Sequence, residues 1–77
     1  MPNPTEIVAA NIRAEMARQR KSQTDLAAAL GTTQQAISAR FNAKTPFSIE
    51  QVTRAADFLG VPASVLFGDT ILNVVAS

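Results

Sequence analysis

The chain has 77 residues, which is enough for one domain with one compact core and too short for a second domain. Its composition, 47% hydrophobic and 17% charged, is typical of a globular protein. The sequence contains neither Cys nor His, so it lacks thiolate nucleophiles, disulfides and the commonest acid-base group and metal ligand. These absences argue against an enzyme, a metal site and a bound cofactor.

The N-terminal residues have neither a basic start nor an apolar run, and no stretch approaches the roughly 20 apolar residues of a membrane span. We therefore expect no targeting segment and no membrane partner. A secreted domain of this size usually carries disulfides. The sequence thus favours a cytoplasmic protein.

The charge is unevenly distributed along the chain, although the net charge is only +1. Residues 13–44 carry six basic and two acidic side chains, a net +4, whereas the rest of the chain carries one basic and four acidic side chains, a net −3. One side of the folded domain is therefore expected to be basic. Three carboxylates within the chain are interpreted as surface charges: Glu15, Asp25 and Glu50.

Capping signals predict the first two helices. Asn3-Pro4-Thr5-Glu6 has the pattern of a helix start, and the spacing of apolar residues then predicts a helix over about residues 4–20. Ser22 is expected to cap a second helix, with Asp25 in its first turn, where the helix dipole favours negative charge. Gly31 is expected to end this helix, because glycine adopts the left-handed C-terminal conformation without steric cost.

A third helix is predicted to begin after Thr33, whose hydroxyl can cap it. Ile37 and Phe41 lie four positions apart on its inward stripe. The outward face is expected to carry Gln34, Gln35, Ser38 and Ala39. Residues 42–47, which include Pro46, are interpreted as a loop.

The remaining chain predicts a fourth helix and a short fifth one. Ser48 and Gln51 form a capping-box pattern at the start of a helix over about residues 48–59, and Gly60 ends it. The helical periodicity of this segment comes from Ile49, Val52, Ala56 and Leu59. Pro62 then opens a short helix whose apolar face consists of Val65, Leu66 and Phe67. The expected core includes Leu26, Leu30, Ile37, Val52 and Leu59.

The sequence therefore predicts an all-α fold of four to five helices over residues 1–69, followed by an apolar tail over residues 70–77. The tail is rich in β-branched residues and favours a strand over a helix. Three roles fit it: covering the core of its own monomer, pairing as a strand with a second subunit, or continuing into a longer protein. Dimerisation is the role that we favour, and an exposed apolar strand would invite such association.

Residues 23–38 combine the features of a helix, a tight turn and a second helix. Ala27 is small where two helices must approach closely, and Gly31 makes the turn. The second of these helices begins with adjacent glutamines, Gln34 and Gln35. A Gln amide can donate to and accept from adenine at once in the DNA major groove, and the N-terminal end of a recognition helix reaches base edges first.

Two segments of the chain resemble the lambdoid phage repressor and Cro family. They are Gly31-Thr32-Thr33-Gln34-Gln35-Ala36-Ile37 and Gly60-Val61-Pro62-Ala63-Ser64-Val65-Leu66-Phe67-Gly68. The first is most similar to the recognition region of the phage 434 repressor and Cro. The resemblance extends over residues 13–67. It implies a lambda-repressor-like DNA-binding domain whose second and third helices form a helix-turn-helix.

By this resemblance, Gln34 and Gln35 read bases, while Ser38 and Ala39 face later base pairs. The positions that meet the DNA backbone are Gln23, Thr33, Arg40, Asn42 and Lys44. Such contacts position a protein without specifying sequence. Basic side chains at the end of the first helix are favoured by the helix dipole alone, so we assign no contact to Arg18, Arg20 or Lys21.

The chain also departs from the family pattern. Met16 and Phe41 occupy positions where the most similar relatives carry a buried Arg and Glu ion pair, and packed apolar residues can replace such a pair without loss of stability. Ala43 replaces a common loop glycine. Ser38 and Ala39 are shorter than the matching side chains of the relatives.

The resemblance implies a transcriptional regulator that binds double-stranded operator DNA as a homodimer, without a small-molecule substrate. It would be a phage-type repressor, either Cro-like or an immunity repressor, acting in a bacterial or phage-infected cell and on the nucleoid when bound to DNA. The short chain without a second domain favours the Cro-like type. The alternative is a helix-turn-helix fold used as a protein interaction module, an antitoxin or anti-repressor that buries the tail in a partner.

Overall fold

The computed structural model of the protein describes residues 4–42 and 46–68. The described residues contain no strand, so the predicted all-α fold is confirmed. The labelled helices are α1 (Pro4–Gln19), α2 (Gln23–Leu30), α3 (Gln34–Phe41) and α4 (Ile49–Leu59), and residues 63–68 form a further helical segment. The expected cap Asn3 and the tail at residues 70–77 lie outside the described residues.

Side-chain caps start three of these helices as the sequence predicts. Ser22 and Asp25 form a capping box, in which the Ser22 hydroxyl accepts from the Asp25 N–H at 3.0 Å and the Ser22 N–H donates to the carboxylate at 3.1 Å. Ser48 and Gln51 form a second capping box at α4. Thr33 caps α3 by accepting from the backbone N–H of Ala36 at 3.1 Å. Each helix start thus satisfies backbone donors with its own residues.

The α2 capping box makes the stability of the fold depend on pH. The N–H of Ser22, then its hydroxyl and to a smaller extent Lys21, lower the pKa of Asp25 below its usual value. A lowered pKa in the folded state stabilises the protein fully above the unfolded-chain value of about 3.9. This stabilisation is lost as the pH falls through the lower folded pKa.

Replacing Asp25 by Asn keeps a hydrogen-bond acceptor but removes the charge. We expect the urea midpoint of the parent to fall more between about pH 6 and about pH 2.5 than that of Asp25→Asn. Urea unfolding of both proteins at the two pH values, with an NMR titration of the Asp25 carboxyl, measures the difference. An equal fall in both proteins would show that the capping carboxylate does not contribute.

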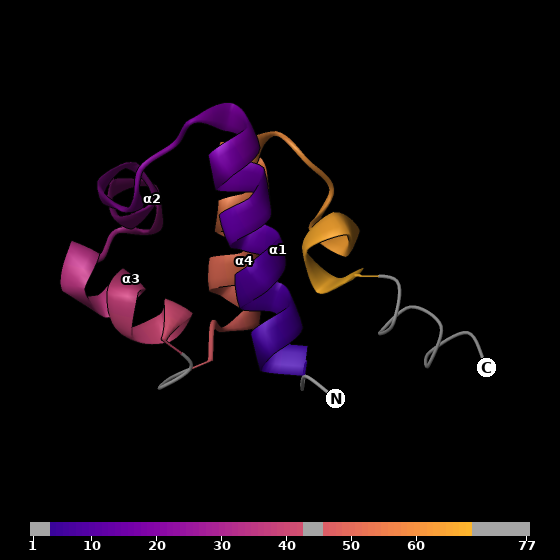
Figure 1. Ribbon diagram of the computed structural model, residues 1–77, viewed down its shortest axis with the longest axis horizontal. Helices are drawn as coiled ribbons and strands as arrows, with labels where there is room; N and C mark the ends of the chain where they lie inside the picture. The colour runs from indigo at the N-terminus through magenta and orange to yellow at the C-terminus, as the bar shows by residue number, and fades with distance from the viewer. Residues whose placement is uncertain (1–3, 43–45, 69–77) are drawn as a thin grey trace.

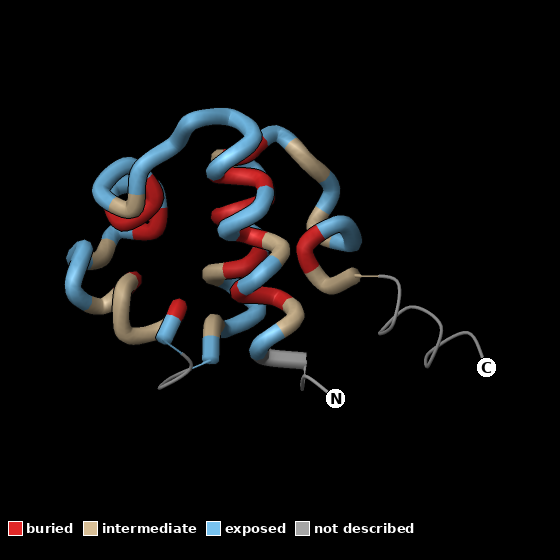
Figure 2. Tube along the Cα trace, in the orientation of Figure 1, coloured by how far each residue is buried: buried red, intermediate tan, exposed pale blue. Residues whose placement is uncertain are grey.

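The core receives one large, fully buried side chain from every helical segment. These side chains are Ile12, Leu26, Ile37, Val52 and Leu66, each at most 1% exposed. The smaller members of the core pack around them, and Leu30 and Leu59 are buried as expected. Figure 2 shows that the buried positions of the helices face the interior. Because every segment contributes to one core, α2 and α3 are held by the same packing as the rest of the domain.

The helices are arranged around α1, which runs through the middle of the molecule (Figure 1). In this view α2 and α3 lie on one side of α1, and the helical segment at residues 63–68 lies on the other side. Amides of α1 cap the ends of other helices: Gln19 donates to the Leu59 carbonyl at 2.7 Å and Asn11 to the Leu66 carbonyl at 2.9 Å. These bonds hold the end of α4 and the segment at residues 63–68 against α1.

Three details differ from the sequence predictions. Glu15 is buried rather than a surface charge, because Arg18 pairs with its carboxylate at 2.9 Å and Gln19 donates to it at 3.5 Å. Ile49 belongs to the apolar stripe of α4 by spacing but is 77% exposed, since it is the first residue of the helix and precedes the turn that packs. The first helix ends at Gln19, one residue before the expected end.

Candidate nucleic-acid interface

The turn between α2 and α3 is built from a glycine and a short connection. Gly31 adopts the left-handed conformation, with φ of 68°, and its N–H donates back to the last turn of α2. The N–H of Thr32 donates to the carbonyl of Ala27 at 2.9 Å, and Ala27 itself is 4% exposed. Ala27 is therefore a buried residue beside the turn, a place that its small side chain suits.

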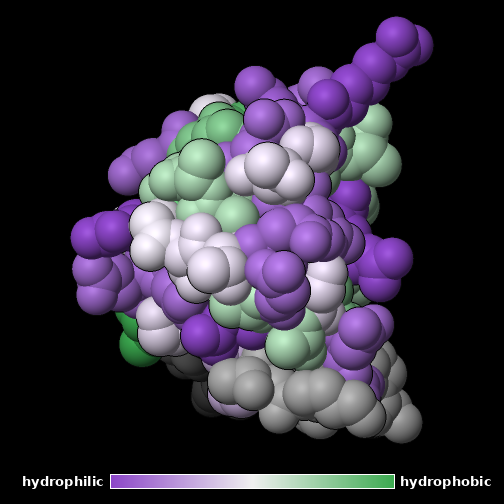
Figure 3. Space-filling view, turned by 90° about the vertical axis from the view of Figure 1, so that its left-hand side faces the viewer, coloured by the Kyte–Doolittle hydropathy of each residue, from purple (hydrophilic) through white to green (hydrophobic). Residues whose placement is uncertain are grey.

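Helix α3 is attached to the core by one side only. Ile37 is fully buried and Phe41 nearly so, whereas Gln34 and Gln35 at the start of the helix are exposed. Figure 3 shows the side of the molecule on which α2 and α3 lie, where hydrophilic and weakly hydrophobic residues cover most of the surface. A helix presented in this way can enter a groove without exposing its core residues.

Three of the expected site residues are joined by hydrogen bonds on this surface. Gln23 of α2 accepts through Oε1 from the Ser38 hydroxyl at 2.7 Å and from Gln34 Nε2 at 3.2 Å. Gln34 Nε2 also donates to the Ser38 hydroxyl at 3.1 Å. We call Gln23, Gln34 and Ser38 the amide triangle. It links the start of α2 to the first two turns of α3 and orients both amides.

The remaining expected residues have varied surroundings. Thr33 and Asn42 are exposed at the two ends of α3, where they form its caps, and Ala39 is half-buried. Gln35 makes no side-chain hydrogen bond to any residue that the structure describes. Lys44, together with the loop position Ala43, lies outside the described residues.

Arg40 is turned toward the loop and the start of α4. Its guanidinium donates to the Pro46 carbonyl at 2.7 Å and lies over the Phe47 ring at 5.9 Å from the centroid. Its Nε is buried and has no hydrogen-bond partner within residues 4–42 and 46–68. Arg40 therefore holds Pro46 and Phe47 close to α3, in addition to bringing positive charge to this side.

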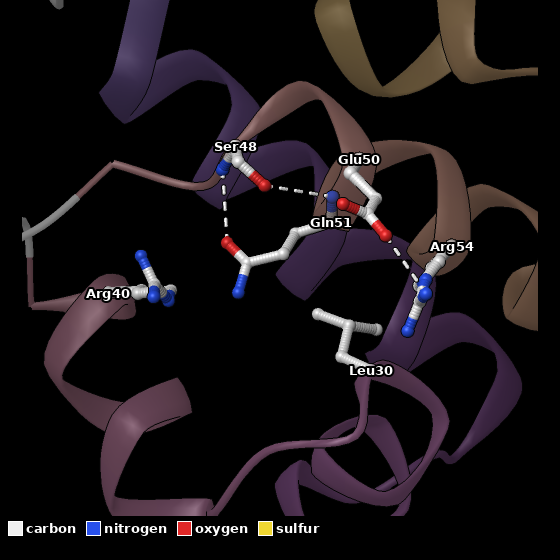
Figure 4. A pocket seen from close by; sticks show the side chains of 6 residues that line it. All are labelled: Leu30, Arg40, Ser48, Glu50, Gln51 and Arg54. Atoms are coloured by element: carbon white, nitrogen blue, oxygen red, sulfur yellow. Dashed lines mark hydrogen bonds and ion pairs between the residues drawn. The ribbon is translucent and has the colours of Figure 1, made fainter.

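Figure 4 shows the cavity of about 300 Å³ that lies beside Arg40. The α4 capping box forms one part of its lining, and Arg54 pairs with Glu50 at 2.9 Å on another part. The cavity is lined by Leu30, Arg40, Ser48, Glu50, Gln51 and Arg54. A carboxylate thus already neutralises one of the two arginines in this lining.

Met16 and Phe41, the two positions at which the sequence predicts apolar residues in place of an ion pair, are packed in the core. Met16 is 5% exposed and Phe41 is 8% exposed, and both belong to the core. The Phe41 ring contacts Phe47 edge-on, with centroids 5.5 Å apart, and carries the guanidinium of Arg13 at 5.6 Å from its centroid. Sequence reasoning assigned no role to Arg13, because this stacking joins residues 28 positions apart.

The helix-turn-helix family model matches residues 12–66, most of the chain. The chain belongs to the helix-turn-helix family. This helix-turn-helix protein is similar to the solved structure of a hypothetical transcription factor, NHTF, from Neisseria, with a TM-score of 0.77 and 23% identity over 96% of this chain and 91% of that one. The likeness shows a shared fold. No curated protein matches the chain.

Membership of this family makes the protein a DNA-binding transcriptional regulator, and helix-turn-helix regulators are typically not enzymes. None of the helices in the described part of the chain combines the length and apolar character that a membrane crossing requires. Nor do residues 4–42 and 46–68 gather three or more potential metal ligands in one place.

Proposed function

We propose that this helix-turn-helix protein is a phage-type repressor that binds operator DNA as a homodimer and inserts α3 into the major groove. Repression would follow from occupying a promoter. The observation that carries the proposal is the presentation of Gln34 and Gln35 at the exposed start of α3, while the opposite side of the helix is fixed in the core. Residues in this place on a recognition helix reach base edges first.

The amide triangle supports different roles for Gln34 and Gln35, the two glutamines that open α3. Both N–H groups of Gln34 Nε2 are used within the triangle, which leaves its Oε1 as an acceptor for a base edge. No residue among 4–42 and 46–68 bonds the amide of Gln35, so both of its ends can face a base. We infer that these two residues read sequence, with Ser38 and Ala39 limiting what fits one turn later.

Backbone contacts would come from the residues around this reading surface. Gln23, Thr33, Asn42, Arg40 and Lys44 are proposed to meet sugar and phosphate, which fixes the register of α3 on the duplex. We also propose that residues 1–69 form the DNA-binding domain and that residues 70–77 take part in dimerisation. Two linked half-sites about 34 Å apart increase affinity beyond that of one monomer.

Selecting bound duplexes from a random DNA pool tests the proposal, followed by titration of the selected duplex and of scrambled DNA at two salt concentrations. We expect a palindromic duplex, bound by two protein chains at least about a thousandfold better than scrambled DNA. Sedimentation of the complex gives the stoichiometry. Weak binding that is equal for all sequences and disappears with salt would contradict the proposal and favour the protein interaction module.

A further inference from the structure

A pocket of about 200 Å³ lies between α1 and the start of α2, beside the reading surface and separate from the cavity of Figure 4. Its lining combines an apolar floor with two cations and one amide. The residues are Arg13, Met16, Ala17, Lys21, Gln23 and Phe41. Only Gln23 among them was expected to contact DNA from the sequence, so the cations need an explanation.

The exposed arginines differ in whether a carboxylate pairs with them. Arg18 pairs with Glu15 and Arg54 pairs with Glu50, each at 2.9 Å. Arg13 pairs with no carboxylate of the described residues, and its guanidinium instead stacks on Phe41. Stacking occupies the face of a guanidinium and leaves its N–H edges available for an anion. The structure therefore holds a positive charge at the pocket without cancelling it.

The second cation of the pocket is a weaker candidate. The ammonium group of Lys21 lies 5.1 Å from the centroid of the Phe58 ring. It is also close enough to Asp25 to help lower the pKa of that carboxyl, so a negative charge partly offsets it. Arg13 is therefore the stronger candidate, since no carboxylate of residues 4–42 and 46–68 pairs with it.

The amide of Gln23 is held in place by the amide triangle. Its Oε1 accepts two hydrogen bonds, from Ser38 and from Gln34. Its Nε2, the other end of the same amide, has no partner in residues 4–42 and 46–68, so two N–H donors remain free. Gln23 is also the first residue of α2, where the helix dipole adds partial positive charge.

We propose that this pocket binds a backbone phosphate of DNA, with Arg13 supplying the charge and Gln23 Nε2 a hydrogen bond. The inference rests on the proposed function, because it places the phosphate beside the helix that reads the bases. The proposal also connects Arg13 with the apolar pair of Met16 and Phe41. The resemblance to lambdoid repressors implies a charged residue at position 16. Here Met16 is uncharged, and the charge comes from Arg13, which lies one turn earlier on α1 and stacks on Phe41.

The test compares Arg13→Gln with Arg18→Gln, since both remove one exposed arginine of α1 but only Arg18 is paired. Dissociation constants for the selected duplex and for scrambled DNA are measured over a range of salt. For Arg13→Gln, the slope of log K against log salt is expected to fall by about 0.9 per phosphate contact on both DNAs. The ratio of the two affinities stays unchanged, and Arg18→Gln keeps the parent slope.

Neutral methylphosphonate linkages, introduced one at a time into the duplex, locate the phosphate. At the contacted linkage, the parent and Arg18→Gln are expected to lose more affinity than Arg13→Gln, which keeps only the Gln23 hydrogen bond to that phosphate. Equal slopes for the two variants, or the absence of any linkage coupled to Arg13, would overturn the proposal. If the parent protein showed no sequence preference, the proposed function would be rejected. The salt slopes of the parent and of Arg13→Gln would still test whether the pocket binds a phosphate.

Free inorganic phosphate is the alternative ligand for this pocket, because it carries the same anionic oxygens as the DNA backbone. An NMR titration of the DNA-free protein with inorganic phosphate reports on the Gln23 side-chain amide. A saturable shift that Arg13→Gln removes, combined with unchanged DNA slopes, would assign the pocket to a free anion and overturn the DNA contact. Little response to free phosphate together with the changed slopes supports it.

Discussion

Gln34→Ala is expected to weaken binding to the selected operator by about 1 to 3 kcal/mol, roughly 5- to 150-fold in Kd, with little effect on scrambled DNA. The substitution removes the proposed base contact and two hydrogen bonds of the amide triangle, but it leaves the Ser38 bond to Gln23 in place. Because Gln34 is exposed, the fold is expected to remain intact. Titration of both DNAs, with thermal unfolding of the variant, measures these effects.

The triangle adds a second expectation that an isolated base contact would not have. Gln23→Ala and Gln34→Ala share a hydrogen bond, so their costs on operator DNA are expected to be non-additive in a double-mutant cycle. Thr53→Ala, at an exposed position of α4, serves as the control and is expected to bind like the parent. If Gln34→Ala and Gln35→Ala both bound operator as well as the parent, the assignment of the reading residues would be wrong.

Phe41→Glu is expected to destabilise the protein by about 3 to 5 kcal/mol, because it removes a packed ring and puts a carboxylate in a core whose described residues include no buried cation. Phe41 is 8% exposed and contacts Phe47 and Arg13. For a domain of this length the total stability is of the order of 4 to 12 kcal/mol, so much of it would be lost. Urea unfolding at neutral pH measures the change.

The partner substitution tests whether the site can accept the Arg and Glu ion pair that the resemblance to lambdoid repressors implies for these positions. Met16→Arg combined with Phe41→Glu is expected to recover part of the loss, since the carboxylate then has a buried partner. Met16→Leu conserves volume and is expected to cost less than about 1.5 kcal/mol, which controls for disturbance of the core. A double variant no more stable than Phe41→Glu alone would show that the surrounding packing now admits only apolar residues.

Local signals in the sequence predicted the helices well. The caps Ser22, Thr33 and Ser48, with the terminating Gly31 and Gly60, act within a few residues of the chain, and each is found where its pattern predicts. The core stripes follow the same logic, because helical periodicity decides which residues face inward. The prediction of which residues are buried was wrong at two positions. Ile49 stands at a helix end and is exposed, and the charged residue Glu15 is buried.

The contacts of the candidate site depend on distances between helices, which periodicity does not contain. The amide triangle joins residues 11 and 15 positions apart, and its geometry depends on how α2 and α3 cross. The stacking of Arg13 on Phe41 and the bond from Arg40 to the Pro46 carbonyl arise in the same way. The sequence was enough to name the residues on the outward face of α3. It was not enough to predict which of them form hydrogen bonds with each other or with α2.

The difference between the two glutamines that open α3 has an evolutionary consequence. A change at position 34 would disturb Gln23 and Ser38 at the same time, so a new side chain there requires compensating changes in both helices. Position 35 is exposed and is not part of the triangle. Related regulators that diverge toward new binding sites are therefore expected to vary first at position 35, through single mutational steps.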